Sequence, residues 1–141
     1  MYIDNSELNI LMPSIFLSSE LNRVDWENVQ DSDKNVLIGQ AECYIDSLRY
    51  KGRRAEYGQM GAFPRYIKDT LIPINDDIKR AVCCVVYDLL DTSRDTRKQL
   101  IASGVKSIST GGVSESYADS VIEVGDRYKR YIGKYIFNGI L

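Results

Sequence analysis

The chain has 141 residues, of which 44% are hydrophobic and 27% are charged, and its formal net charge is −2. This length and composition predict a single globular domain over residues 1–141, and they argue against both a disordered chain and a strongly basic, general nucleic-acid binder. The chain has no histidine, so the commonest catalytic acid or base and a common zinc ligand are both missing.

Motifs for catalysis are also missing. The sequence contains no glycine-rich phosphate-binding motif, and its paired carboxylates stand at predicted helix starts, where capping explains them. We therefore expect no enzyme activity, no cofactor and no bound metal. The longest apolar run, residues 81–87, is too short to cross a bilayer, and no signal peptide is visible. We expect a protein without membrane contact that is made in a reducing cytoplasm.

The charges are unevenly distributed along the chain. Residues 1–48 carry nine acidic and two basic side chains, whereas residues 49–80 carry eight basic and four acidic ones. Patches of opposite sign can attract a second copy of the chain head to tail. Alternatively, both patches lie together within one subunit, and the sequence leaves these two arrangements open.

The first 30 residues have the least regular pattern. Apolar residues from Leu8 to Leu21 indicate helix, and Pro13 is suited to the first turn of a short helix over about 13–21. Trp26 follows in an acidic linker, where we expect its ring to cover the core.

A long helix is predicted over about residues 32–50. Asp31 and Ser32 are good N-cap residues, and Gly52 follows where a helix end favours a residue with positive φ. The helix has one apolar stripe at the α-helical period, formed by Leu37, Ala41, Tyr44, Ile45 and Leu48.

A second long helix is predicted over about residues 76–90, after the helix-start residues Pro73 and Asn75. It is apolar around most of its girth, so we expect it to be the central helix. Three cysteines fall in helical patterns, with no spacing typical of a metal site, and we predict that all are buried and reduced; they are Cys43, Cys83 and Cys84.

The loop between these helices ends in Phe63-Pro64-Arg65. Pro64 keeps Phe63 out of the α region, and we predict that Phe63 anchors the loop in the groove between the two helices. Arg65 would then be free to reach a carboxylate on a neighbouring segment or chain. Arg53 and Arg54 are further candidate contacts between subunits.

A short helix over about 95–103 and a β-hairpin near residues 105–117 are predicted next, the hairpin turning at two adjacent glycines. Its serine-rich arms have little apolar surface to bury, so we expect another chain to complete it. The candidate contacts between subunits are Ser107, Ser109, Gly111, Gly112, Ser114 and Glu115.

The last predicted helix covers about residues 124–137. One face carries tyrosine and isoleucine, and another carries Arg127, Arg130 and Lys134. Aromatic residues among basic ones suit either a packing face or the binding of single-stranded DNA. The predicted fold is thus mainly α, a small bundle of four to five helices with one β-hairpin.

Several short motifs stand in a characteristic order. They are Met1-Tyr2-Ile3-Asp4, Tyr44-Ile45-Asp46, Lys51-Gly52, Gln59 before Phe63-Pro64-Arg65, Ile72-Pro73, Gly104 to Ser109, and Ser114-Glu115-Ser116-Tyr117. In their order and spacing, residues 1–117 resemble the head–tail connector (head completion or adaptor) proteins of long-tailed bacteriophages. No motif of this kind follows Tyr117.

The resemblance implies a structural virion protein in the neck, at the head–tail interface. Such proteins form a homo-oligomeric ring, for this type a dodecamer, beneath the portal protein, extend the DNA channel and present a surface to the next head-completion (stopper) or tail protein. DNA would pass through without sequence-specific binding. The terminal segment would be a docking helix whose Arg127, Arg130 and Lys134 contact the portal. The alternative is a phage replication accessory protein that binds single-stranded DNA, and the net negative charge argues against it.

Overall fold

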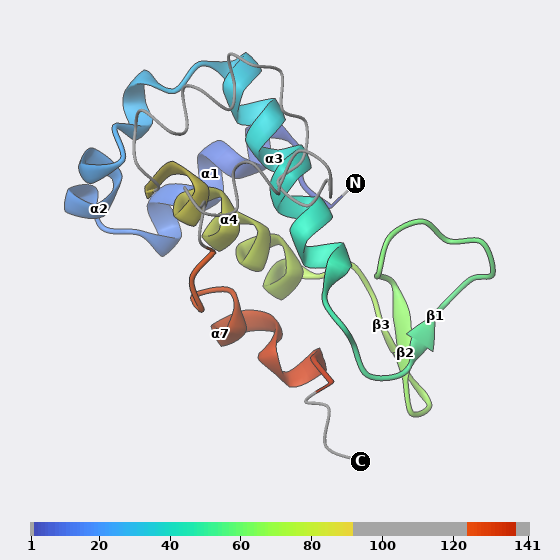
Figure 1. Ribbon diagram of the computed structural model, residues 1–141. Helices are drawn as coiled ribbons and strands as arrows, with labels where there is room; N and C mark the ends of the chain where they lie inside the picture. The colour runs from blue at the N-terminus through green and yellow to red at the C-terminus, as the bar shows by residue number, and fades with distance from the viewer. Residues whose placement is uncertain (1, 92–123, 138–141) are drawn as a thin grey trace, which may run out of the picture.

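The computed structural model describes residues 2–91 and 124–137 (Figure 1). Its fold is mainly helical, as predicted, with a small three-stranded antiparallel sheet. In Figure 1 the helices form one group, and the sheet projects from one side of it. The described helices are α1 (Asn5–Ile15), α2 (Ser18–Arg23), η1 (Trp26–Asn28), α3 (Asp31–Ser47), α4 (Asp76–Asp91), α7 (Lys129–Ile132) and η2 (Gly133–Tyr135).

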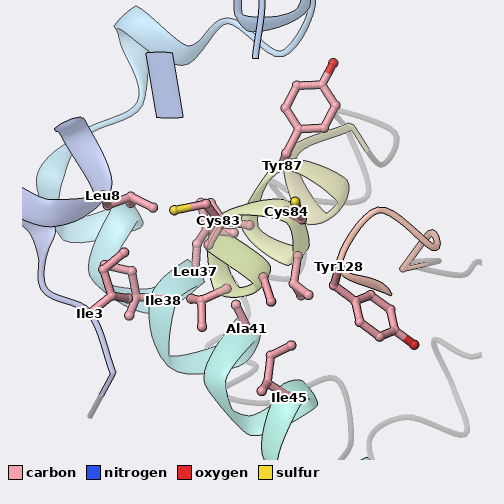
Figure 2. Packing of buried hydrophobic residues seen from close by; sticks show 14 of the residues in the cluster. Ile3, Leu8, Leu37, Ile38, Ala41, Ile45, Cys83, Cys84, Tyr87 and Tyr128 are labelled. Atoms are coloured by element: carbon pink, nitrogen blue, oxygen red, sulfur yellow. The ribbon is translucent and has the colours of Figure 1, made fainter. Parts of the chain in front are cut away.

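Helix α4 is the centre of the core, as its sequence predicts. It begins after Asn75, whose Oδ1 accepts a hydrogen bond from the Ile78 amide at 3.0 Å, as an N-cap residue does. Every residue from 81 to 90 is buried, and α1, α3 and α7 all pack against this helix. Figure 2 shows the side chains of Leu8, Leu37 and Cys83 meeting at one side of α4.

Helix α3 agrees with its prediction to within about one turn at each end. Its buried face includes Leu37, Ala41 and Ile45. The predicted caps were wrong, because the N-cap residue is Gln30 and its side chain makes no capping bond. Asp31 instead lies in the first turn, where its charge favours the positive end of the helix dipole.

The first helix lies earlier than predicted. We placed Pro13 in a first turn, but it lies in the last turn of α1. The helix starts after Asp4 through a reciprocal capping box: the Glu7 amide donates to Asp4 Oδ1 at 2.8 Å, and the Asp4 amide donates to Glu7 Oε1 at 3.4 Å. Trp26 is buried in η1, with Lys34 Nζ 4.5 Å from its ring centroid, so its predicted role over the core is confirmed.

The sheet was not predicted. Strands β1 (Arg53–Arg54), β2 (Arg65–Ile67) and β3 (Thr70–Ile72) pair antiparallel in the order β1-β2-β3. They lie between the two long helices, in and just after the predicted loop that ends in Phe63-Pro64-Arg65. Strands of two or three residues are too short to show an alternating pattern. The predicted helix over 95–103 and the hairpin over 105–117 lie outside the described residues.

The C-terminal segment belongs to the core. In place of one helix over 124–137 there is a single α turn followed by a 3-10 turn, and Gly125 and Gly133 account for the weak helix. Tyr128, Ile132 and Tyr135 are buried. The prediction of one continuous helix over about 124–137 is therefore wrong. No helix in residues 2–91 and 124–137 has the length and apolar character needed to cross a membrane.

Candidate assembly surface

The projecting part of the molecule comprises residues 49–72, which we call the arm, and Figure 1 shows it beyond the end of α3. Its first strand depends on Gly52, which has φ +76°. A Cβ atom at this position would lie 1.8 Å from the carbonyl oxygen of Tyr66 on β2. Only glycine permits both this backbone conformation and this close approach.

Phe63 holds the arm on the helices. Its side chain is only 2% exposed, and its ring meets three others edge-on, with centroid distances of 4.8 Å to Tyr50, 5.7 Å to Tyr135 and 6.4 Å to Tyr2. The predicted burial is confirmed. The three rings belong to the N-terminus, the segment after α3 and the C-terminal segment.

Polar contacts surround this anchor. Asp46 Oδ1 accepts a hydrogen bond from the Ala62 amide at 3.0 Å and another from the Tyr2 hydroxyl. The Tyr2 oxygen in turn accepts from the Phe63 amide at 3.1 Å. Burial is the main reason that the pKa of Tyr2 is raised, so this hydroxyl keeps its proton. The base of the arm is therefore tied to both the N-terminus and α3.

Arg65 also lies at the base of the arm and is buried. Its Nε donates to the carbonyl of Lys51 at 2.8 Å, and its Nη1 donates to the carbonyl of Ala62 at 3.0 Å. The guanidinium lies 5.3 Å from the Tyr50 ring centroid. Our prediction that Arg65 is free to reach a neighbouring chain is therefore wrong, because its donors bind the arm itself.

The tip of the arm, residues 55–60, is mostly exposed, in contrast to the buried base. Tyr57 and Met60 are fully exposed, although large apolar side chains normally gain free energy by burial. Gln59 stabilises this loop, because its Nε2 donates to the carbonyls of Gly61 and Pro64, each at 2.8 Å. Sequence reasoning missed Tyr57 and Met60; two large apolar side chains among glycines and charges, with no helical period, could have indicated them.

Arg53 and Arg54 stand beside the tip and are exposed. The Arg53 guanidinium lies 4.9 Å from the Tyr66 ring centroid, and Arg54 Nε donates to the carbonyl of Gly61 at 3.1 Å. Within the described part of the chain, neither forms a salt bridge with a carboxylate. Both guanidinium groups therefore stay available to an acidic partner.

The basic residues of the C-terminal segment are mostly paired within the chain. Arg127 Nη1 lies 2.5 Å from Oδ1 of the buried Asp88, and Lys134 Nζ lies 2.7 Å from Asp77 Oδ2. Burial raises the pKa of Asp88, although the bonds from Arg127 and from the Gly125 amide act to lower it. The premise that this basic face needs an outside partner was thus wrong for Arg127 and Lys134. Arg130 is exposed.

A buried carboxylate fixes the start of the chain. Glu42 Oε2 accepts from the backbone amides of Tyr2 at 2.6 Å and of Ile3 at 3.1 Å. Burial raises the pKa of Glu42, and the two amide donors partly oppose this. Sequence reasoning missed this residue, which an isolated Glu within the apolar face of α3 could have indicated.

The cysteines divide into two kinds. Cys83 and Cys84 are buried as predicted, and burial raises the pKa of each to about 12. Cys43 is exposed, so its predicted burial was wrong. The remaining predicted subunit contacts, Ser107, Ser109, Gly111, Gly112, Ser114 and Glu115, lie outside the described residues.

Within residues 2–91 and 124–137, no group of three or more Cys, Asp and Glu side chains is placed to hold a metal ion. Comparison with protein families, with curated proteins and with solved structures finds no match for this chain. The case for a function therefore depends on the motif order and on the arm.

Proposed function

We propose that this protein is a head–tail connector of a long-tailed bacteriophage, a structural virion protein in the neck. Copies of the chain form a ring beneath the portal, extend the DNA channel and present a surface to the next head-completion or tail protein. The motif order over residues 1–117, which resembles these proteins, is the basis of the proposal. No catalytic step is involved.

The arm is the observation that supports the proposal best. Its base is buried around Phe63 and Arg65, in the motif that resembles the connector proteins. Its tip exposes Tyr57 and Met60 beside Arg53 and Arg54. An apolar contact rimmed by charge is typical of protein–protein interfaces, in which tyrosine, methionine and arginine are enriched. A rigid base with an exposed apolar tip suits assembly.

The alternative, a single-stranded DNA-binding protein, has little support in the C-terminal segment, and its remaining candidates are the exposed Tyr57, Arg53 and Arg54 of the arm. Stacking on bases requires accessible aromatic rings, but Tyr128 and Tyr135 of the C-terminal segment are buried. Phosphate binding requires free cations, but Arg127 and Lys134 already bind Asp88 and Asp77.

Two binding measurements separate these functions. The purified protein should co-sediment with the portal protein of its phage and should bind a single-stranded oligonucleotide only weakly at physiological salt. Tight oligonucleotide binding that falls steeply as salt rises, without portal binding, would favour the alternative.

A further inference from the structure

Outside the arm, a second group of exposed apolar residues lies on α1 and in the link just after it. Ile10 is 72% exposed and Leu17 is 69% exposed, and Pro13 between them is exposed too. Ile10 and Pro13, at the spacing i, i+3, lie on one side of α1. Leu17 follows the helix, in the extended link to α2. The opposite side of α1 carries Leu8 and Met12, both buried against the core. The surface formed by Ile10, Pro13 and Leu17, which we call the α1 face, therefore has no apolar cover within the described part of the chain.

The arm of the same molecule is poorly placed to cover the α1 face. Figure 1 shows α1 and α2 on one side of the molecule and the three strands on the other. Helix α3 has 17 residues and leads from the α2 side to the arm, and a helix of that length spans about 25 Å. The tip of the arm and the α1 face of one molecule are thus on different sides, where each can contact a different copy.

The charges around the two surfaces have opposite signs. The arm, residues 49–72, has six basic and two acidic side chains. Residues 4–31, which contain α1 and α2, have six acidic side chains and one basic. Some of these acids are paired within the chain, as Glu7 is with Lys79, but the excess negative charge of this region remains. Opposite charges at the rim of an apolar contact guide partners into one orientation.

We propose that the tip of the arm docks on the α1 face of a second copy, with Tyr57 and Met60 against Ile10 and Leu17, and Arg53 and Arg54 toward the acidic residues around it. The proposal rests on the connector function, and the arm and the α1 face would be the surfaces that join neighbouring subunits. Because this contact joins two different surfaces, it is head-to-tail, and contacts of this kind build a ring when the rotation closes. It corresponds to one of the two arrangements of charge that the sequence left open, the contact between copies.

Site-directed disulfide crosslinking tests the pairing. One preparation carries Met60→Cys, another carries Leu17→Cys, and both carry Cys43→Ser to remove the exposed native thiol. Cys83 and Cys84 can stay, because burial raises their thiol pKa to about 12 and leaves them unreactive. The two preparations are mixed with the portal and oxidised.

The control replaces Leu17→Cys by Lys129→Cys, because Lys129 is also exposed but lies on α7. We expect at least a tenfold higher yield of the Met60–Leu17 disulfide than of the Met60–Lys129 disulfide. Changing Arg53 and Arg54 to Glu should lower the Met60–Leu17 yield about tenfold. The monomer should still unfold in one cooperative transition, since the contacts of these two side chains in the described part of the chain are exposed ones within the arm.

Equal yields for the two pairs, or a dominant disulfide between two copies of Met60→Cys, would overturn the proposed contact. Failure of this contact can be distinguished from failure of the connector function. A ring on the portal without the Met60–Leu17 crosslink overturns this contact and leaves the connector function standing. The crosslink without any portal binding supports the contact and overturns the connector function.

Discussion

Replacing Phe63 by Ala removes the side chain on which the attachment of the arm depends. Truncating a fully buried Phe typically costs about 3–5 kcal/mol, from lost apolar burial and from the cavity left behind. Phe63 is only 2% exposed and meets three aromatic rings, and such edge contacts add about 0.5–1.5 kcal/mol each beyond burial. We therefore expect the loss to lie in the upper half of that range, at about 4 kcal/mol.

Thermal and urea unfolding measure this loss. For a domain of this size, about 2–4 °C of Tm is lost per kcal/mol, so Phe63→Ala should unfold roughly 8–16 °C below the unchanged protein. Tyr57→Ala is the matched control, because it also removes an aromatic ring from the arm, but one that is fully exposed. Its free energy of unfolding should change by no more than about 0.5 kcal/mol.

One result would refute this reasoning. If Phe63→Ala changes the free energy of unfolding by less than about 1 kcal/mol, the arm is not part of the cooperative unit. Hydrogen exchange on the same variant would then show β2 amides that open independently of the helices. The attachment of the arm to the helices, and with it the rigid position of the tip, would then be disproved.

Three further predictions concern other parts of the structure. Arg127→Ala should cost about 1–3 kcal/mol in urea unfolding, because it removes a charged hydrogen-bond donor from the buried Asp88 carboxylate; an unchanged midpoint would contradict this. Gly52→Ala should destabilise the protein by more than about 1 kcal/mol, since φ is +76° and the added Cβ would meet the Tyr66 carbonyl; an unchanged Tm would show that the turn can rearrange. Burial raises the pKa of Tyr50 above its ordinary value, so the neutral Tyr50 side chain stabilises the fold fully below about pH 10, and this contribution is lost as pH rises further. Between about pH 9 and pH 11 the free energy of unfolding should therefore fall less in Tyr50→Phe than in the unchanged protein.

The parts of the fold that could be predicted are those with a long, regular pattern. Helix α4 is predictable because apolar residues around most of its girth leave few alternatives to a central position, and α3 because its stripe persists over several turns. The burial of Phe63 could be predicted from the proline after it, which restricts its backbone.

Short elements and long-range partners could not be predicted. Strands of two or three residues show too little alternation, so the sheet was missed. Arg65 looks like any surface arginine in sequence, and only the fold brings the carbonyls of Lys51 and Ala62 within its reach. The same holds for Arg127, whose partner Asp88 lies 39 residues away along the chain. A basic stripe in a sequence does not show which of its members are paired.

Electron microscopy of the purified protein with the portal protein of its phage tests the central claim most directly. The connector function predicts a closed ring of copies of this chain, coaxial with the portal and continuous with its channel. Each subunit should present its arm toward the α1 side of the next. Portal particles that carry no added density, together with a protein that stays monomeric at high concentration, would contradict the account.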